Sequence, residues 1–413
     1  MVNQTSIRRA FFHRVCLTLI ASLSGLSLFS QQYNFENFTL ENGLPQATIF
    51  AIYQDSRGYL WLGTEGSGVC RFDGKSFQVI NHSDGLAGDV VRSILEDDKG
   101  NMWFGTDAGV SVYDGSKLIT INEDKGLSSN TIVCLYRDKH DTIWVGTAGE
   151  KGGLNKIAAL DGDSIKIVQY NIDTGLSNNN VFSICEDNYD RLWIGTFGGG
   201  ITILTKDGTA KPVFLTEFHN FPSNHILAIS PDSINNLWIG TYDKGVLKIS
   251  VTENLNHSKI ENVNSSFNIQ DNTIWAILPT SNGIWFGSNE NGVSRLMDNK
   301  IRSVNSTNGL LRNQIVSIIK DREENIWLSS GDGGISRYLG DRFYSISKKE
   351  GLGEENVYSI AVSREGDIWI GTYGGGLYRL APGQAPYIFK NYNVNDGLPR
   401  SEEHTSELQS LSH

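Results

Sequence analysis

A tryptophan followed by nearly the same three residues recurs eight times along the chain. The tetrapeptides "WLGT", "WFGT", "WVGT", "WIGT", "WIGT", "WFGS", "WLSS" and "WIGT" begin at Trp61, Trp103, Trp144, Trp193, Trp238, Trp285, Trp327 and Trp369. Successive tryptophans are 41 to 49 residues apart, a period that is typical of propeller-type repeats. Because a single unit of this length cannot cover its own apolar faces, the chain must bury each unit against its neighbours.

Each unit divides into four short apolar segments separated by turn residues. Between residues 87 and 122 these segments are "DVVRSILED", "NMWFGT", "VSVYD" and "KLITIN". β-branched and apolar residues bounded by Gly, Asp and Asn predict four strands joined by tight turns. The fold predicted is therefore all-β: a β-propeller of four-stranded blades with about eight repeats, in which the tryptophan of the second strand packs between blades.

The number of blades in the closed ring depends on an extra segment before the first full unit. Residues 35–44, "FENFTLENGL", match the last strand and the connector of a unit, so we expect this strand to complete the final blade. Residues 31–340 would then form a seven-bladed propeller, and residues 341–399 the first blade region of a second one. A single eight-bladed ring is the alternative, and the sequence does not decide between them.

The N-terminus has the layout of a secretory signal peptide. A basic stretch, residues 8–14, precedes the apolar stretch 15–29 and the small residue Ser30. We expect residues 1–30 to be a signal peptide and the protein to be periplasmic, an uncleaved anchor being the alternative. Cys16 would be removed with this segment. Cys70, Cys134 and Cys185 lack CxxC spacing and are expected to be small buried side chains.

The remaining composition excludes several classes of function. The formal net charge of −11 and the absence of a basic stripe argue against binding to nucleic acid or to an anionic membrane surface. The glycines of 195–200 lead into a strand rather than a helix, so they do not predict a phosphate loop. We interpret the aspartates at the ends of the first strands as turn residues: Asp55, Asp97, Asp138, Asp187 and Asp321. No catalytic residue, metal site or cofactor is predicted.

The repeated pattern of "GL", a β-branched strand, "DxxG" and "WΦGTxxG", in which Φ is apolar, is similar to the two-component regulator propeller repeat and spans residues 35–399. The resemblance implies the periplasmic sensor portion of a hybrid two-component histidine kinase. A small β domain, a membrane helix and the kinase would follow, and the whole receptor would be a homodimer that controls carbohydrate-use genes. This chain lacks a phosphoacceptor helix and ATP-binding glycine boxes, so it is not itself expected to be an enzyme.

Some units depart from the pattern. Unit five, at 217–226, has no "GL"; unit six has the shortened turn 279–283 and is preceded by a polar insertion at 252–272; unit seven has "WLSS". These irregularities are interpreted as sequence drift, the alternative being dedicated binding loops.

Candidate ligand-binding residues lie in the loops that precede the innermost strand and follow the second strand, which share one face of a propeller. They are Asn130, Asn179, Phe197, His219, His225, Tyr242, Asn313, Asn356 and Tyr373. Amides with a few aromatic rings suit a neutral polyhydroxylated ligand, so we expect a small oligosaccharide of undetermined identity. The alternative is that asparagine merely favours turns. Two other functions stay open: a secreted propeller enzyme acting on polysaccharide (lyase or glycosidase), and a periplasmic protein-interaction platform.

The C-terminal residues break the repeat. Residues 387–399 are in register with the other units, whereas "RSEEHTSELQS" at 400–410 has no blade pattern. This peptide is similar to the translation of a common sequencing-adapter oligonucleotide. We expect residues 400–413 to be a non-native tail, with the natural frame continuing into further blades; a genuine disordered tail is the alternative.

Overall fold

The computed structural model describes residues 35–161, 164–205, 213–214, 221–267, 269–340, 352–353, 356–363, 367–380 and 389–398. The predicted signal peptide and non-native tail lie outside these residues. The chain divides into two compact units, Met1–Asp341 and Arg342–His413. The described strands form eight antiparallel four-stranded sheets, seven in the first unit and one in the second. The all-β propeller architecture predicted from the repeat is thereby confirmed.

The strands of the first unit fall into four positions, counted from the centre of the ring outwards. The innermost strands are β2 (Ile49–Gln54), β6 (Val91–Glu96), β10 (Ile132–Arg137), β14 (Val181–Glu186), β18 (Ile226–Pro231), β22 (Ile274–Thr280) and β26 (Ile315–Lys320). The second strands are β3 (Leu60–Thr64), β7 (Met102–Thr106), β11 (Ile143–Thr147), β15 (Arg191–Thr196), β19 (Asn236–Thr241), β23 (Gly283–Ser288) and β27 (Ile326–Ser330). The third strands are β4 (Val69–Phe72), β8 (Gly109–Tyr113), β12 (Leu154–Asp161), β16 (Gly200–Thr205), β20 (Val246–Ser250), β24 (Val293–Met297) and β28 (Gly334–Tyr338). The outer strands are β5 (Phe77–Ile80), β9 (Leu118–Ile121), β13 (Ser164–Tyr170), β17 (Val213–Phe214), β21 (Lys259–Asn262), β25 (Lys300–Val304) and β1 (Phe35–Phe38).

The second unit and the helices complete the inventory. The sheet of the second unit consists of β29 (Val357–Val362), β30 (Ile368–Thr372), β31 (Gly376–Leu380) and β32 (Phe389–Tyr392). The helices are short: α3 (Val263–Phe267) and the 3-10 turns η1 (Leu40–Asn42), η2 (His82–Asp84), η3 (Glu123–Lys125), η4 (Ile172–Thr174), η5 (Leu255–His257) and η7 (Val394–Asp396). Within the described ranges, no helix combines the length and the apolar character that crossing a bilayer requires.

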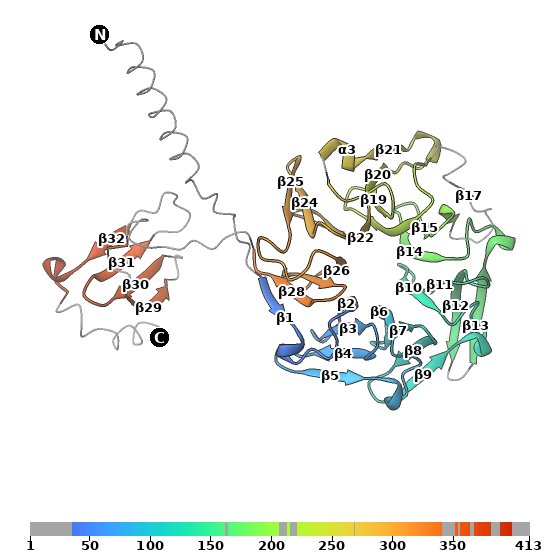
Figure 1. Ribbon diagram of the computed structural model, residues 1–413, viewed down its shortest axis with the longest axis horizontal. Coiled ribbons are helices and arrows are strands. Elements are labelled where there is room, and N and C mark those ends of the chain that lie inside the picture. Colours follow the sequence, from blue (N-terminus) through green and yellow to red (C-terminus); the bar gives the residue numbers. More distant parts are fainter. Residues whose placement is uncertain are drawn as a thin grey trace, which may run out of the picture. The chain divides into compact units, whose positions relative to one another are not determined.

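The ring of the first unit is closed by its N-terminal strand (Figure 1). β1 pairs with β28, so that Phe35 lies opposite Tyr338 and Phe38 opposite Ile335. The innermost strands of neighbouring sheets contact one another around the ring, including β2 of the first sheet with β26 of the seventh. Seven sheets therefore make the ring, and its seventh sheet combines three strands from the end of the unit with one from its beginning.

The repeated tryptophans pack between sheets. In the first unit their side chains are no more than 6% exposed. The Trp61 ring lies 5.4 Å from Phe104 of the second sheet, and the Trp238 ring lies 5.8 Å from Phe286 of the sixth. Burying each indole against the next sheet removes a large apolar area from water, which is the main stabilising contribution expected for a repeat array.

In six sheets of the ring, an aspartate that follows the innermost strand connects the hairpin turn to the tryptophan. Asp55 Oδ1 accepts hydrogen bonds from the backbone N–H groups of Arg57 and Tyr59, and Asp55 Oδ2 accepts one from Trp61 Nε1 at 2.8 Å. These aspartates hold the turns, as predicted from the sequence. Their hydrogen bond to the tryptophan was not predicted, because the residue spacing alone did not indicate it. Asp232, which the predicted series omits, makes the same bond to Trp238 at 3.0 Å.

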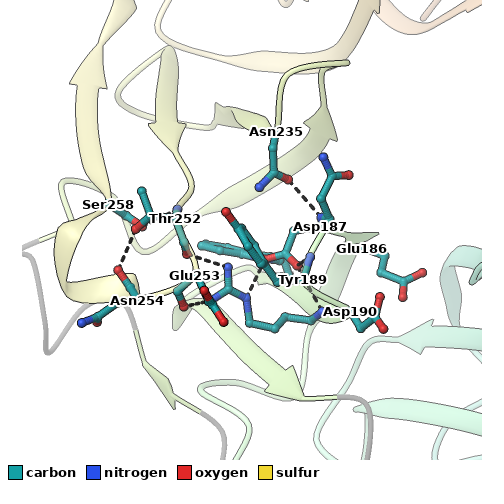
Figure 2. A network of polar contacts seen from close by, with 12 residues as sticks. Glu186, Asp187, Tyr189, Asp190, Asn235, Thr252, Glu253, Asn254 and Ser258 are labelled. Carbon is teal, nitrogen blue, oxygen red and sulfur yellow. Dashed lines mark hydrogen bonds and ion pairs between the residues drawn. The ribbon is translucent and has the colours of Figure 1, made fainter.

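A buried arginine at this turn joins the fourth and fifth sheets, and Figure 2 shows the polar network around Asp187, Thr252 and Glu253. Arg191 Nε donates to Asp187 Oδ2 at 2.7 Å, while its two terminal nitrogens donate to the carbonyl oxygens of Thr252 and Glu253, each at 2.9 Å. The guanidinium also lies over the Tyr189 ring, 4.8 Å from its centroid. The stretch 252–272, expected to be a polar insertion, contains η5, the outer strand β21 and α3. Much of it is therefore a regular part of the fifth sheet, and Arg191 anchors its beginning.

The three cysteines of the ring are expected to be inert in the folded protein. Cys70 and Cys185 are buried, Cys134 is partly buried, and all three are free thiols. Burial raises the pKa of Cys70 and of Cys134 to about 12 and raises that of Cys185 as well. Since the thiolate is the reactive form, a Cys16→Ser chain at pH 8 should bind thiol reagents such as Ellman's reagent only after unfolding. Rapid labelling of the native protein would contradict this prediction.

Candidate functional site

Two loops of every sheet meet at one end of the ring. The backbone N–H of the residue that follows the second strand donates to the carbonyl of the residue that precedes the innermost strand. Phe197 donates to Asn180 at 2.9 Å, and Tyr242 donates to His225 at 3.0 Å. The same bond recurs in the other sheets of the first unit, from Glu65, Asp107, Ala148, Asn289 and Gly331. We call this end of the ring the mouth, and the residues that follow the second strands form its rim.

Aromatic side chains from the fourth and fifth sheets gather at the mouth. The Phe197 ring lies 5.4 Å from Phe182, 4.7 Å from His225 and 5.7 Å from Tyr242, measured between ring centroids. His225 and Tyr242 are 6.4 Å apart. The Tyr242 side chain is 50% exposed, and the other three are partly buried. These four residues, the aromatic cluster, offer apolar ring edges and faces together with a phenol and an imidazole.

Phe182 owes its position to an irregularity of the innermost strand. The pairing of β14 with β15 shifts register between Val181 and Ser183, which leaves Phe182 as an extra residue. Such a bulge redirects the side chain that it contains. Every innermost strand of the ring shifts at the same place. The residues in this position are Phe50, Arg92, Val133, Phe182, Leu227, Trp275 and Val316.

Two of the other bulge positions carry polar groups. Trp275 Nε1 donates to Asn289 Oδ1 at 3.1 Å, and Gln314 Nε2 donates to the same oxygen at 2.9 Å. In the first two sheets, the Arg92 guanidinium lies 5.0 Å from the centroid of the Phe50 ring. Arg92 Nη1 is buried and meets no hydrogen-bond acceptor within the part of the chain that the structure describes. The mouth therefore combines aromatic rings with amides in the sixth and seventh sheets and with the Arg92 cation in the first and second.

The nine predicted site residues do not all contribute to this cluster. Phe197, His225 and Tyr242 come together as described, whereas His219 lies outside the described residues. The asparagines hold the preceding turn: Asn130 Oδ1 accepts from the Glu123 N–H at 2.8 Å, and Asn179 and Asn313 make the equivalent bonds to Ile172 and Ser306. Asn356 and Tyr373 lie in the second unit at the positions that His225 and Tyr242 hold in the fifth sheet, and Tyr373 contacts Tyr358 at 5.5 Å.

The chemistry available at the mouth is that of recognition. Aromatic rings can stack against the apolar faces of a sugar ring, and amides can exchange hydrogen bonds with its hydroxyl groups. Among the described residues, no three His, Cys, Asp or Glu side chains are grouped in a way that could hold a metal ion. In the sequence, Phe182 is an aromatic residue at the second position of an innermost strand. The strand pattern alone treats this position as an ordinary part of the sheet, so it did not mark Phe182 as a site residue.

The repeats match a known family. The family model described as two component regulator propeller matches residues 43–66, 85–108, 126–149, 175–198, 220–243, 268–290 and 351–374. Each match runs from the connector before an innermost strand to the rim residue of the same sheet, or just beyond it. No curated protein matches the chain.

Solved structures with the same fold include sensor domains and an enzyme. The extracellular domain of a putative hybrid two component system from B. thetaiotaomicron is 24% identical, with a TM-score of 0.64 over 88% of this chain and 49% of that one. A second such domain from the same organism is 21% identical, with a TM-score of 0.59 over 90% of this chain and 49% of that one. A streptogramin B lyase is 14% identical, with a TM-score of 0.57 over 75% and 99% of the two chains. At these identities the likeness concerns the fold, and this chain spans about half the length of the two sensor domains.

Proposed function

Since this chain carries the repeats of the two-component regulator propeller family, we propose that it is the ligand-sensing propeller of a two-component signal-transduction receptor. The chain acts outside the cytoplasm, and its N-terminal basic and apolar stretches direct export. In the complete receptor a membrane helix and a histidine kinase follow the propeller, and the receptor works as a homodimer. The two solved sensor domains, roughly twice as long as this chain, support this placement.

The ligand proposed is a neutral oligosaccharide, bound at the mouth. The observation that carries this proposal is the aromatic cluster, in which Phe182, Phe197, His225 and Tyr242 converge from two sheets. A half-exposed tyrosine beside partly buried rings is well suited to contact the apolar face of a sugar, while neighbouring amides bind hydroxyl groups. Occupation of this surface would report the available saccharide, and the receptor would switch on carbohydrate-use genes in response.

Removing the two central rings should abolish most of the binding. We expect the double substitution Phe197→Ala and Tyr242→Ala to weaken oligosaccharide binding roughly thirtyfold, because two aromatic contacts contribute about 2 kcal/mol together. The measurement is isothermal titration calorimetry of the chain against a panel of short neutral oligosaccharides. Chromatography of the same mixtures detects any shortened product, which would indicate an enzyme instead.

The control for this experiment is a double variant away from the mouth. Val168→Ala with Ile234→Ala alters two exposed side chains, on β13 and in the hairpin turn of the fifth sheet, and should bind as the unmodified chain does. If no saccharide in the panel binds, or if the Phe197 and Tyr242 variant binds unchanged, the proposed site is wrong.

A further inference from the structure

The hairpin turns at the opposite end of the innermost strands share one polar contact in six sheets of the ring. An aspartate Oδ2 accepts a hydrogen bond from the indole N–H of the repeated tryptophan at 2.7–3.0 Å. The pairs are Asp55–Trp61, Asp97–Trp103, Asp138–Trp144, Asp187–Trp193, Asp232–Trp238 and Asp321–Trp327. A carboxylate at this place satisfies an indole that is otherwise enclosed by apolar groups.

The sixth sheet lacks this carboxylate. Its hairpin is shortened to a tight turn in which Thr280 pairs with Gly283, and Thr280 Oγ1 donates to the Gly283 carbonyl at 2.7 Å. Trp285 is still 4% exposed. Within the described ranges, its indole N–H has no hydrogen-bond acceptor. The shortened turn at 279–283, which the sequence marks as a departure from the repeat, therefore leaves this indole N–H without the carboxylate partner that the other six have.

A cavity of about 230 Å³ lies at this place, between the sixth and seventh sheets, and Trp285 lines it. Two cationic side chains line it as well. Arg295 lies over the Trp285 ring, 5.0 Å from its centroid, and Arg295 Nε donates to the Asn282 carbonyl at 3.0 Å. Lys320 contacts Glu324 Oε1 at 2.8 Å, and that glutamate is 65% exposed. The cavity thus brings the indole N–H together with the side chains of Arg295, Lys320 and Glu324.

We propose that this cavity, the sixth-sheet groove, binds the carboxylate group of a small acidic ligand, of which a hexuronate is the type. The ligand carboxylate takes the place of the missing aspartate: one oxygen accepts the Trp285 N–H, and Arg295 and Lys320 supply the positive charge. A charged acceptor makes such a hydrogen bond stronger than a neutral one does. The Ser281 hydroxyl and the Asn282 amide, which also line the cavity, are placed to bind hydroxyl groups of the ligand.

The groove between the third and fourth sheets provides an internal comparison. It is of similar size, about 280 Å³, and it is lined by Asp138, Trp144 and Lys156. There the Trp144 N–H already donates to Asp138 at 2.9 Å, and Lys156 lies over the Trp144 ring as Arg295 does over Trp285. The two grooves are therefore alike in size and in having a cation over the tryptophan ring. They differ in the indole N–H, which has a carboxylate partner at Trp144 and, among the described residues, none at Trp285.

This inference does not rest on the oligosaccharide proposal. The innermost strand runs from the mouth to the hairpin, so the sixth-sheet groove and the aromatic cluster lie at opposite ends of the strands. Substitutions at one place leave the other intact, and the failure of either proposal can be recognised separately.

The test compares acidic and neutral probes on the full chain. Binding of D-glucuronate, D-glucose and succinate is measured by ligand-observed NMR for the unmodified chain and for Trp285→Phe, which removes the N–H and keeps a ring. We expect glucuronate to bind and glucose not to bind, and the variant to lose roughly tenfold to hundredfold in affinity. Succinate binding would show that the carboxylate alone is recognised, while glucuronate binding without succinate would show that the sugar ring is required as well.

A matched substitution in the third sheet separates binding from stability. Trp144→Phe removes the indole N–H that donates to Asp138 Oδ2, so it should lower the thermal unfolding midpoint by roughly 2–6 °C and leave glucuronate binding unchanged. Trp285→Phe should lower the midpoint less and weaken glucuronate binding by the roughly tenfold to hundredfold given above. Glu324→Gln should strengthen binding severalfold, because it frees Lys320. Equal binding of glucose and glucuronate, no glucuronate binding at all, or unchanged binding in Trp285→Phe would each overturn the proposal.

Discussion

Phe38→Ala is expected to lower the free energy of unfolding of the ring by about 3 kcal/mol. Phe38 ends the strand that closes the ring, and its side chain lies between the seventh and first sheets. Its ring centroid is 5.7 Å from Trp327 and 5.2 Å from Phe72. Loss of a large aromatic side chain leaves a cavity at this junction, and such truncations cost roughly 3–5 kcal/mol in a fully buried site. The lower end applies because Phe38 is only partly buried.

Denaturant unfolding followed by tryptophan fluorescence measures this effect. Val79→Ala on the outer strand β5 is the control, since its side chain is 39% exposed and should change the free energy by no more than about 0.5 kcal/mol. An equal change in the two variants would mean that β1 does not hold the ring closed.

Asp187→Ala is expected to cost about 3–5 kcal/mol. The carboxylate is buried and accepts hydrogen bonds from Arg191 Nε at 2.7 Å, from Trp193 Nε1 at 2.8 Å and from the Tyr189 backbone N–H at 2.8 Å. Removing it leaves the Arg191 guanidinium, whose side chain is 8% exposed, without its counter-ion. An uncompensated buried charge of this kind is among the most destabilising changes known in proteins.

Asp97→Ala provides the matched comparison for Asp187→Ala. Asp97 occupies the same position in the second sheet, where it binds Trp103 and Asn101 and no arginine. Its loss should cost about 1–2 kcal/mol, the usual cost of leaving neutral donors unsatisfied. Calorimetric unfolding measures the loss of stability in both variants. Similar losses of unfolding free energy would show that the charge of Arg191 is not what makes Asp187 important.

The regular part of the fold is predictable from local pattern. Alternating apolar residues and Gly or Asp turns identify the four strands of a unit, and a tryptophan at a constant place in the second strand identifies a packed position. The number of sheets in the ring depends instead on the pairing of β1 with β28. That pairing joins residues about 300 positions apart, and a local pattern carries no information about it. The bond from Asp55 to Trp61 was missed for a related reason: it depends on how a turn folds back on its strand.

The candidate site was predictable only in part. Phe197, His225 and Tyr242 follow from the loops that a propeller brings to one face. Phe182 does not, because a register shift rather than strand alternation turns it towards the mouth. The asparagines were grouped with the ligand-binding residues on chemical type. In the structure the Asn130 side chain holds a connecting turn, in line with the stated alternative, and its ligand-binding role stays a prediction.

The closing strand also determines the order in which the ring can assemble. Six sheets can form from strands that adjoin in sequence, as each is completed. The seventh must wait for β1 to meet β28, across about 300 residues of chain. Closing a loop of that length instead of one of about 40 residues adds only roughly 2 kcal/mol of chain entropy, so the thermodynamic cost is modest. The kinetic consequence is larger, because folding slows as contacts become more distant in sequence. Until β28 has been synthesised, β1 has no partner strand. A partly synthesised propeller can therefore pair with other chains through β1, the strand that later closes the ring.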